Sequence, residues 1–163
     1  MTLAEFIYIA PLVTAGTAVF SAMVASIWAY VNIRANRQMA RDRAAIDLIF
    51  KREWDARYQQ HRVTFNHLRA SPEPLAVWFS HDRQHTEEAN SIRYIFNDYE
   101  LLALAMRKKV IDPRLYQAWF RGSMLTDFQA AESAIQVIRV LVGNPRLYDE
   151  WEKLARQWMA EKH

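Results

Sequence analysis

The sequence predicts an all-α protein with a single N-terminal transmembrane helix followed by a cytoplasmic helical bundle of about four to five helices. Three observations predict this fold class. Residues 6–33 carry no charge, apolar residues recur at helical spacing through the rest of the chain, and no stretch shows the period-two alternation of a half-buried strand. The expected parts are a short exported tail (1–11), a transmembrane helix (12–33), a basic juxtamembrane segment (34–43) and a cytoplasmic helical domain (44–163).

The uncharged run is long enough to cross a bilayer. A bilayer core requires about 20 apolar helical residues, and residues 6–33 provide 28. Pro11 suits the first turn of a helix, where its missing N–H has no cost, so the helix is expected to begin near Leu12. A cleaved signal peptide has a basic start and a shorter apolar core. The first five residues of this chain include no basic residue, and its apolar run is longer than such a core. We therefore expect a retained anchor.

A cluster of positive charge follows the apolar run. Cytoplasmic flanks of transmembrane helices carry an excess of Lys and Arg. The cluster thus predicts a single-pass membrane protein, with its N-terminus outside and its C-terminal domain in the cytoplasm. The same side chains are expected to contact anionic lipid headgroups, at about 1 kcal/mol each. Its four members are Arg34, Arg37, Arg41 and Arg43.

This cluster also accounts for the formal net charge of +3, because its four arginines and Asp42 together reach that value. A nucleic-acid-binding protein usually spreads basic residues along a face with aromatic residues between them. No nucleic-acid partner is expected.

Small residues form a stripe along the predicted span. Their alternating spacing of three and four residues places them on one face of a helix, and small side chains let helices approach closely in lipid. The stripe favours packing against another transmembrane helix, from a different subunit or from a second copy of this chain. A chance pattern in an alanine-rich segment is the alternative. The stripe consists of Ala15, Ala18, Ala22, Ala25 and Ala29.

Apolar spacing and capping residues predict the first helices of the domain. An apolar face extends from Ile46 to Leu68, with no Pro or Gly to interrupt it until Pro72. Whether the membrane helix continues unbroken into this face or bends near residues 34–43 is open. A short helical turn is expected over 75–79. Thr86 then opens a long helix, whose apolar stripe is Ile92, Ile95, Phe96, Tyr99, Leu102, Ala103 and Met106.

Proline and glycine divide the remainder of the domain. Asp112-Pro113 is typical of an N-cap followed by a first-turn proline, and Gly122 is expected to separate that segment from the next helix. Gly143 is expected to end that helix as its C-terminal cap. Asn144-Pro145 is expected to start a last helix, with an apolar face of Tyr148, Trp151, Leu154 and Trp158.

The sequence offers little catalytic chemistry. The chain has no Cys and three scattered Gly, which excludes disulfides, thiolate sites and Gly-rich phosphate loops. His81, His85 and Glu88 have the spacing of a helical metal-binding face, but their polar surroundings favour a solvated loop, so they form only a weak candidate metal site. His61 and His67 are expected at the surface.

Two acidic residues interrupt an otherwise apolar helix. Asp98 and Glu100 flank Tyr99, so they point in different directions and do not form a close acid–base pair. A structural ion pair with Arg93, Arg107 or Arg139 is the favoured interpretation. No catalytic residue, metal or cofactor is expected.

A block from 97 to 106 (NDYELLALAM), with residues 110–112 and 115–116, resembles an uncharacterised bacterial family catalogued only as a domain of unknown function. The closing segment 144–148, followed by Trp151 and Trp158, is similar to that family as well. The resemblance implies an anchored helical domain in a bacterial inner membrane and no known activity.

Three functions remain as hypotheses. The first is a non-catalytic membrane-anchored accessory or scaffold subunit of a larger inner-membrane complex, whose partners are lipids and other transmembrane subunits. The second is a self-associating single-span effector or sensor, in which the alanine stripe pairs copies of the chain. The third, and the least supported, is an enzyme with a metal at His81 and His85.

Overall fold

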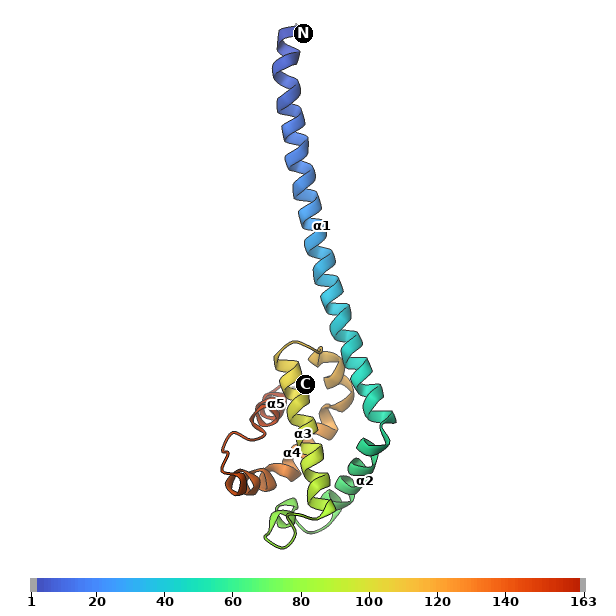
Figure 1. Ribbon diagram of the computed structural model, residues 1–163, viewed down its shortest axis with the longest axis vertical. Helices are drawn as coiled ribbons and strands as arrows, with labels where there is room; N and C mark the ends of the chain where they lie inside the picture. Colours follow the sequence, from blue (N-terminus) through green and yellow to red (C-terminus); the bar gives the residue numbers. More distant parts are fainter. Residues whose placement is uncertain (1–2, 162–163) are drawn as a thin grey trace. The chain divides into compact units, whose positions relative to one another are not determined.

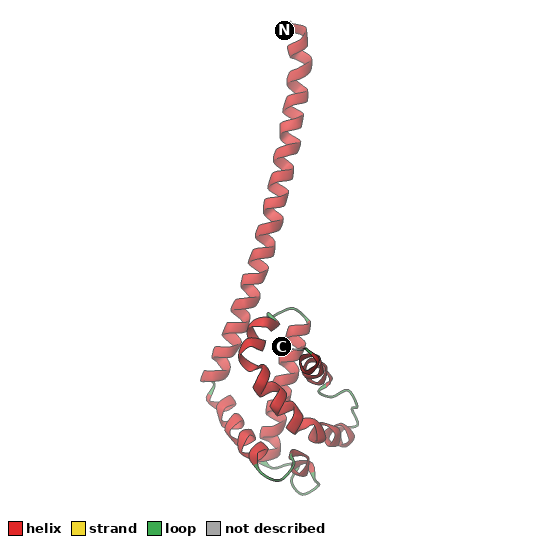
Figure 2. Ribbon diagram, turned by 180° about the vertical axis from the view of Figure 1, so that it is seen from behind, coloured by secondary structure: helices red, strands yellow, loops and turns green. Residues whose placement is uncertain are grey.

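A computed structural model describes residues 3–161 of the chain and the side chains of residues 13–161. Within residues 3–161 it contains five α-helices, one 3-10 helix and no strand (Figures 1 and 2). The predicted all-α fold class is confirmed. The elements are α1 (Leu3–Trp54), α2 (Ala56–Ala70), η1 (Leu75–Phe79), α3 (Glu87–Arg107), α4 (Pro113–Val142) and α5 (Asp149–Ala160).

The chain forms two compact units, Met1–Ala40 and Arg41–His163. The described part of the first unit is helical throughout and belongs to α1. Because α1 already begins at Leu3, Pro11 does not lie in its first turn, and the predicted start near Leu12 is wrong. A proline inside a helix removes one backbone hydrogen bond, a loss that transmembrane helices often tolerate.

The second unit starts with the last part of α1, which ends at Trp54. The expected apolar face continues past this point, but the helix does not. Asp55 has extended backbone geometry, and its carboxylate accepts hydrogen bonds from the N–H groups of Arg57 (2.9 Å) and Tyr58 (3.0 Å). It is therefore the N-cap of a new helix, α2. A search for Pro and Gly alone does not detect this break.

Several expected boundaries are confirmed. Residues 75–79 form the short helical turn η1. Thr86 caps α3 by accepting from the N–H of Ala89 (3.3 Å), and Asp112 caps α4 by accepting from the N–H of Arg114 (2.8 Å). Gly143 ends α4 in the left-handed conformation, at φ 67°. Each boundary follows from a residue whose own chemistry satisfies a free helix end.

Two further expected boundaries are wrong. Gly122 lies inside α4, which is continuous from Pro113 to Val142. One glycine costs a helix only about 1 kcal/mol, less than a long buried face supplies. Asn144-Pro145 does not start the last helix either. The Asn144 side chain instead accepts from the N–H of Arg146 (3.1 Å) in a turn, and α5 begins at Asp149 after Tyr148, which has φ 62°.

The core of the second unit lies between α2, η1, α3, α4 and α5. All seven residues of the predicted α3 stripe are buried. Trp151 of α5 is fully buried and contacts three other rings: it stacks on Tyr99 (centroids 4.7 Å apart) and packs against Phe96 and Phe128. Burial of large aromatic rings is a major source of stability in a domain of this size.

Candidate functional site

The apolar part of α1 is the first candidate functional surface. Every side chain of residues 13–31 is exposed, including the five alanines of the predicted stripe and large apolar groups such as Phe20 and Ile27. Polar groups in this segment bond to their own helix: the Thr17 hydroxyl donates to the Thr14 carbonyl (2.9 Å), and the Ser26 hydroxyl donates to the Ala22 carbonyl (2.7 Å). Such internal satisfaction is what a lipid environment requires.

Among the described residues, one helix is long and apolar enough to cross a membrane, and this is α1. The basic cluster that follows its apolar part is accessible. Arg34, Arg37 and Arg43 are exposed, and Arg41 is half-buried.

A network of paired charges joins the elements of the domain. We call it the Arg–Asp network, and its members are Arg52, Arg62, Arg69, Asp98, Tyr99, Tyr116 and Asp127. Arg52, near the end of α1, is buried and reaches α3 and α4. Its guanidinium donates to both carboxylate oxygens of Asp98, with Nε 3.3 Å from Oδ1, and to the hydroxyl of Tyr116.

Asp127 of α4 is the second acidic centre of this network, and it is completely buried. Its carboxylate accepts hydrogen bonds from Arg62 and Arg69 of α2 and from the hydroxyl of Tyr99 of α3 (2.7 Å). Arg62 also donates to the Tyr99 oxygen (3.3 Å). A buried carboxylate is stable when several donors surround it. Because its donors belong to α2 and α3, Asp127 links these two helices to α4.

The environment of the network keeps its tyrosines protonated. Burial raises the pKa of Tyr99, and the nearby charge of Asp127 raises it further. Burial likewise raises the pKa of Tyr116, against the opposing effect of Arg52. Burial also raises the pKa of Asp98, although the neighbouring Arg52 charge lowers it in part. Because both carboxylates already accept from guanidinium groups, the arrangement suits structural pairing better than acid–base catalysis.

The structure corrects the expected partners of Asp98 and Glu100. Asp98 pairs with Arg52 instead of Arg93, Arg107 or Arg139. Glu100 accepts from two backbone N–H groups at the start of α5, those of Glu150 (3.3 Å) and Trp151 (2.8 Å). It therefore acts as a cap for another helix.

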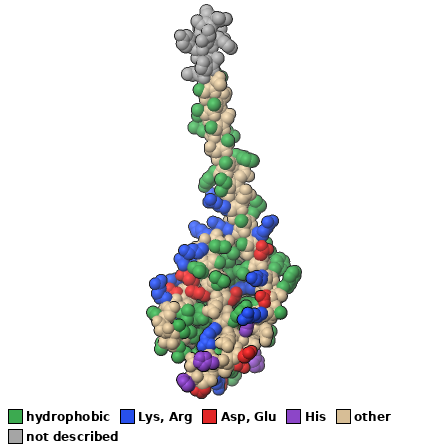
Figure 3. Space-filling model, viewed as in Figure 1, with side chains coloured by type: hydrophobic (Ala, Val, Ile, Leu, Met, Phe, Trp, Pro, Cys, Tyr) green, Lys and Arg blue, Asp and Glu red, His purple; other side chains and the backbone are tan. Residues whose placement is uncertain are grey.

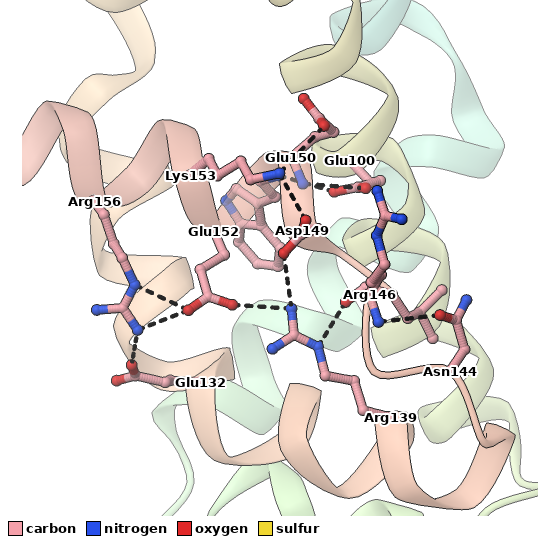
Figure 4. A network of polar contacts seen from close by, with 12 residues as sticks. Glu100, Glu132, Arg139, Asn144, Arg146, Asp149, Glu150, Glu152, Lys153 and Arg156 are labelled. Carbon is pink, nitrogen blue, oxygen red and sulfur yellow. Dashed lines mark hydrogen bonds and ion pairs between the residues drawn. The ribbon is translucent and has the colours of Figure 1, made fainter.

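A second, more exposed network holds α5 against α4 (Figure 4). Arg139 of α4 lies 2.9 Å from the Glu152 carboxylate and donates to the Leu147 carbonyl (2.8 Å). Arg156 of α5 lies 2.7 Å from Glu152 and 3.0 Å from Glu132 of α4. These pairs fix the helix that carries Trp151.

The histidines do not assemble into a site. His81 and His85 lie in turns before α3 and are exposed, so the helical face expected with Glu88 does not form. Among the described residues, no group of three or more His, Cys, Asp or Glu is placed to hold a metal. His67 is exposed, as expected. His61 is half-buried instead, stacked on Tyr94 (4.3 Å) with its Nδ1 3.0 Å from the Ser91 hydroxyl.

Fold and surfaces together define an all-helical domain that follows one apolar helix of membrane-spanning length. The chain belongs to the family of the domain of unknown function DUF4760, whose model matches residues 17–158. The expected membership of a family without assigned activity is thus confirmed. The match begins within the apolar part of α1, so the family includes most of this segment as well as the domain. Neither the curated proteins nor the solved structures contain a match.

Proposed function

We propose that this chain is a non-catalytic, membrane-anchored accessory or scaffold subunit of a larger protein complex in the bacterial inner membrane. Its N-terminus would lie outside and its helical domain in the cytoplasm. The observation that carries the proposal is the apolar segment of residues 13–31, whose side chains are all exposed. A surface of this size and polarity requires lipid or another helix around it.

The alanine stripe supports a protein partner in addition to lipid. Ala15, Ala22 and Ala29 lie on one exposed helical face, and neighbouring helices in a bilayer associate through such small residues. In the domain, the carboxylates of Asp98 and Asp127 are occupied by arginines of the same chain. A scaffold needs a rigid domain of this kind and no reactive group.

Native mass spectrometry of the full-length chain, extracted from its own membrane in mild detergent, tests this proposal. We expect co-purification with other membrane subunits at a fixed stoichiometry. Ala22→Leu should reduce the amount of partner recovered by about tenfold, equivalent to about 1.4 kcal/mol, because the larger side chain separates the helices. Val24→Leu, about 200° around the helix from Ala22, is the matched control and should have little effect.

A second candidate function is favoured by the same stripe. The chain would then be a self-associating effector or sensor, in which Ala22 faces a second copy. A homo-oligomer without other subunits, dissociated by Ala22→Leu, would support this candidate and contradict the accessory role. A monomer in mild detergent and in native lipid nanodiscs would contradict both.

A further inference from the structure

The loop between α3 and α4 has a basic and outward-facing surface. The loop and the helix residues that flank it, 107–114, contain four cationic side chains and one carboxylate. That carboxylate belongs to Asp112, which is buried and caps α4, and the adjacent Ile111 is buried as well. The remaining six residues are exposed: Arg107, Lys108, Lys109, Val110, Pro113 and Arg114.

Within this loop, two lysines lack an acidic partner. Arg107 pairs with Glu150, and Arg114 pairs with Asp112 (2.9 Å). No ion pair forms between Lys108 or Lys109 and any residue of the described chain. Lys109 has φ 57°, so the loop turns sharply at this point. Two exposed lysines directly precede Val110, which is 58% exposed.

The loop lies at the end of the domain at which the chain enters it. Figures 1 and 2 both show the connection between α3 and α4 at this end, near the last part of α1. The charge of Asp42 acts on Arg114, whose pKa is raised mainly by its hydrogen bond to Asp112. Within the unit Arg41–His163, the loop therefore shares one end with the basic residues Arg41 and Arg43. Figure 3 shows several Lys and Arg side chains at this end, others further along the same face, and His side chains towards the opposite end.

The length of the tether restricts where this end of the domain can be. The apolar run ends at Ile33, nine residues before Asp42. Nine residues reach at most about 30 Å when fully extended, and about 14 Å when helical. A span that ends at the lipid surface thus keeps Asp42 within about 30 Å of the headgroups when the tether is extended and within about 14 Å when it is helical.

We propose that the α3–α4 loop is a second membrane contact, which binds anionic lipid headgroups through Lys108 and Lys109 and places Val110 at the lipid interface. The inference rests on the anchor of the proposed function. Basic residues close to an anionic leaflet are attracted to its headgroups, and each additional one strengthens the binding. Trp119, which is 74% exposed and follows Arg114 by five residues in α4, adds a ring of the kind that prefers the interface. An acidic protein surface would also attract the lysines, but the tether gives the lipid surface a far higher effective concentration.

The test uses the full-length chain, whose lack of cysteine permits single-site labelling without other changes. Val110→Cys is labelled with an environment-sensitive fluorophore and placed in nanodiscs that carry a headgroup-attached quencher. Asp82→Cys is the matched control, because Asp82 is 89% exposed and lies in the turns that precede α3, at the other end of that helix. In nanodiscs with phosphatidylglycerol we expect at least twofold stronger quenching at position 110 than at position 82.

Two further changes test the charge dependence. The difference in quenching between positions 110 and 82 should disappear in nanodiscs of phosphatidylcholine alone. The double change Lys108→Glu and Lys109→Glu should reduce this difference at least twofold in anionic nanodiscs. The anchor is checked separately by resistance to alkaline carbonate extraction, which these substitutions should leave intact.

The failures of the two proposals are distinguishable. Equal quenching at both positions in a carbonate-resistant chain would overturn the loop contact and leave the anchor in place. Extraction by carbonate would overturn the anchor, and the loop contact with it. Protection of position 110 only when a co-purified protein is present would assign the loop to a protein surface and overturn the lipid contact.

Discussion

At the scale of single residues, Asp127 is a completely buried carboxylate on which three side-chain hydrogen bonds converge. It accepts from two arginines and one tyrosine, which belong to α2 and α3. Removing its charge would leave Arg62 and Arg69 close together without a counter-ion. The cost of such a buried, unbalanced charge exceeds that of almost any surface substitution.

Asp127→Asn should therefore destabilise the domain by about 3–5 kcal/mol. Urea unfolding of the full-length chain in detergent, followed by tryptophan fluorescence, measures the change. Glu132→Gln is the control, because Glu132 is a half-exposed carboxylate paired with Arg156 at the surface, and its loss should cost less than about 1 kcal/mol. Equal effects of the two substitutions would mean that the Arg–Asp network adds little to stability.

Buried tyrosines make the domain sensitive to alkaline pH. Burial raises the pKa of Tyr148 from 10.0 to about 12 and also raises those of Tyr58, Tyr99 and Tyr116. Between pH 10 and pH 12, Tyr148 releases its proton in the unfolded chain and retains it in the folded chain. Stability supplied by the protonated tyrosines is thus complete below pH 10 and falls as the pH rises, by about 1.4 kcal/mol per pH unit for each tyrosine.

Tyr148→Phe should remove the contribution of one tyrosine from the fall in the free energy of unfolding between pH 10 and pH 12. The measurement is the free energy of unfolding at several pH values, with tyrosinate absorbance recorded on the same samples. A variant with the slope of the parent chain would show that Tyr148 does not titrate differently in the folded and unfolded states.

The sequence indicates which residues are unusual more readily than it indicates their partners. Asp98 and Glu100 stand out because they interrupt an apolar helix, and Asp127 lies between Leu125 and Phe128 in the same kind of context. Spacing along a helix, however, shows only neighbours three or four residues apart. The guanidinium that pairs with Asp98 comes from a residue 46 positions away. Only the packing of α1 against α3 and α4 brings it there.

At the scale of elements, α4 is closed by a glycine that the backbone conformation requires, Gly143, and contains another that the helix does not require, Gly122. Gly143 has φ 67°, which costs a residue with a side chain about 1 kcal/mol. Gly122 lies in the middle of the helix, and a Cβ built on it would meet nothing within 4 Å.

The two glycines should respond in opposite directions to the same substitution. Gly143→Ala should destabilise the domain by about 1 kcal/mol, and Gly122→Ala should stabilise it by about 0.5–1 kcal/mol. Urea midpoints of both variants measure the effects. A gain in stability from Gly143→Ala would contradict its role as a left-handed cap.

Element boundaries were predictable where one residue satisfies a helix end by itself. Thr86, Asp112 and Gly143 do so, and each is found in the expected role. Asp55 makes the same kind of cap, but it lies within an unbroken apolar pattern that hides it. Gly122 gave the opposite error, since a single weak helix former does not end a helix whose two sides share one buried face.

At the scale of the whole chain, two compact units have different surfaces. Residues 13–31 expose apolar side chains throughout, whereas the unit Arg41–His163 buries most of its aromatic residues and pairs most of its buried charges internally. A single family model matches residues from both units. This combination is the reason for proposing that the domain works at a membrane surface.

The proposed orientation can be tested with one cysteine. In the variant Asp82→Cys, the only thiol of the chain lies on an exposed turn of the domain. A membrane-impermeant maleimide should label this thiol in inverted inner-membrane vesicles and should fail to label it in intact spheroplasts, because the domain faces the cytoplasm. Labelling in intact spheroplasts would place the domain outside, and recovery of the chain in the soluble fraction would show that residues 12–33 do not anchor it.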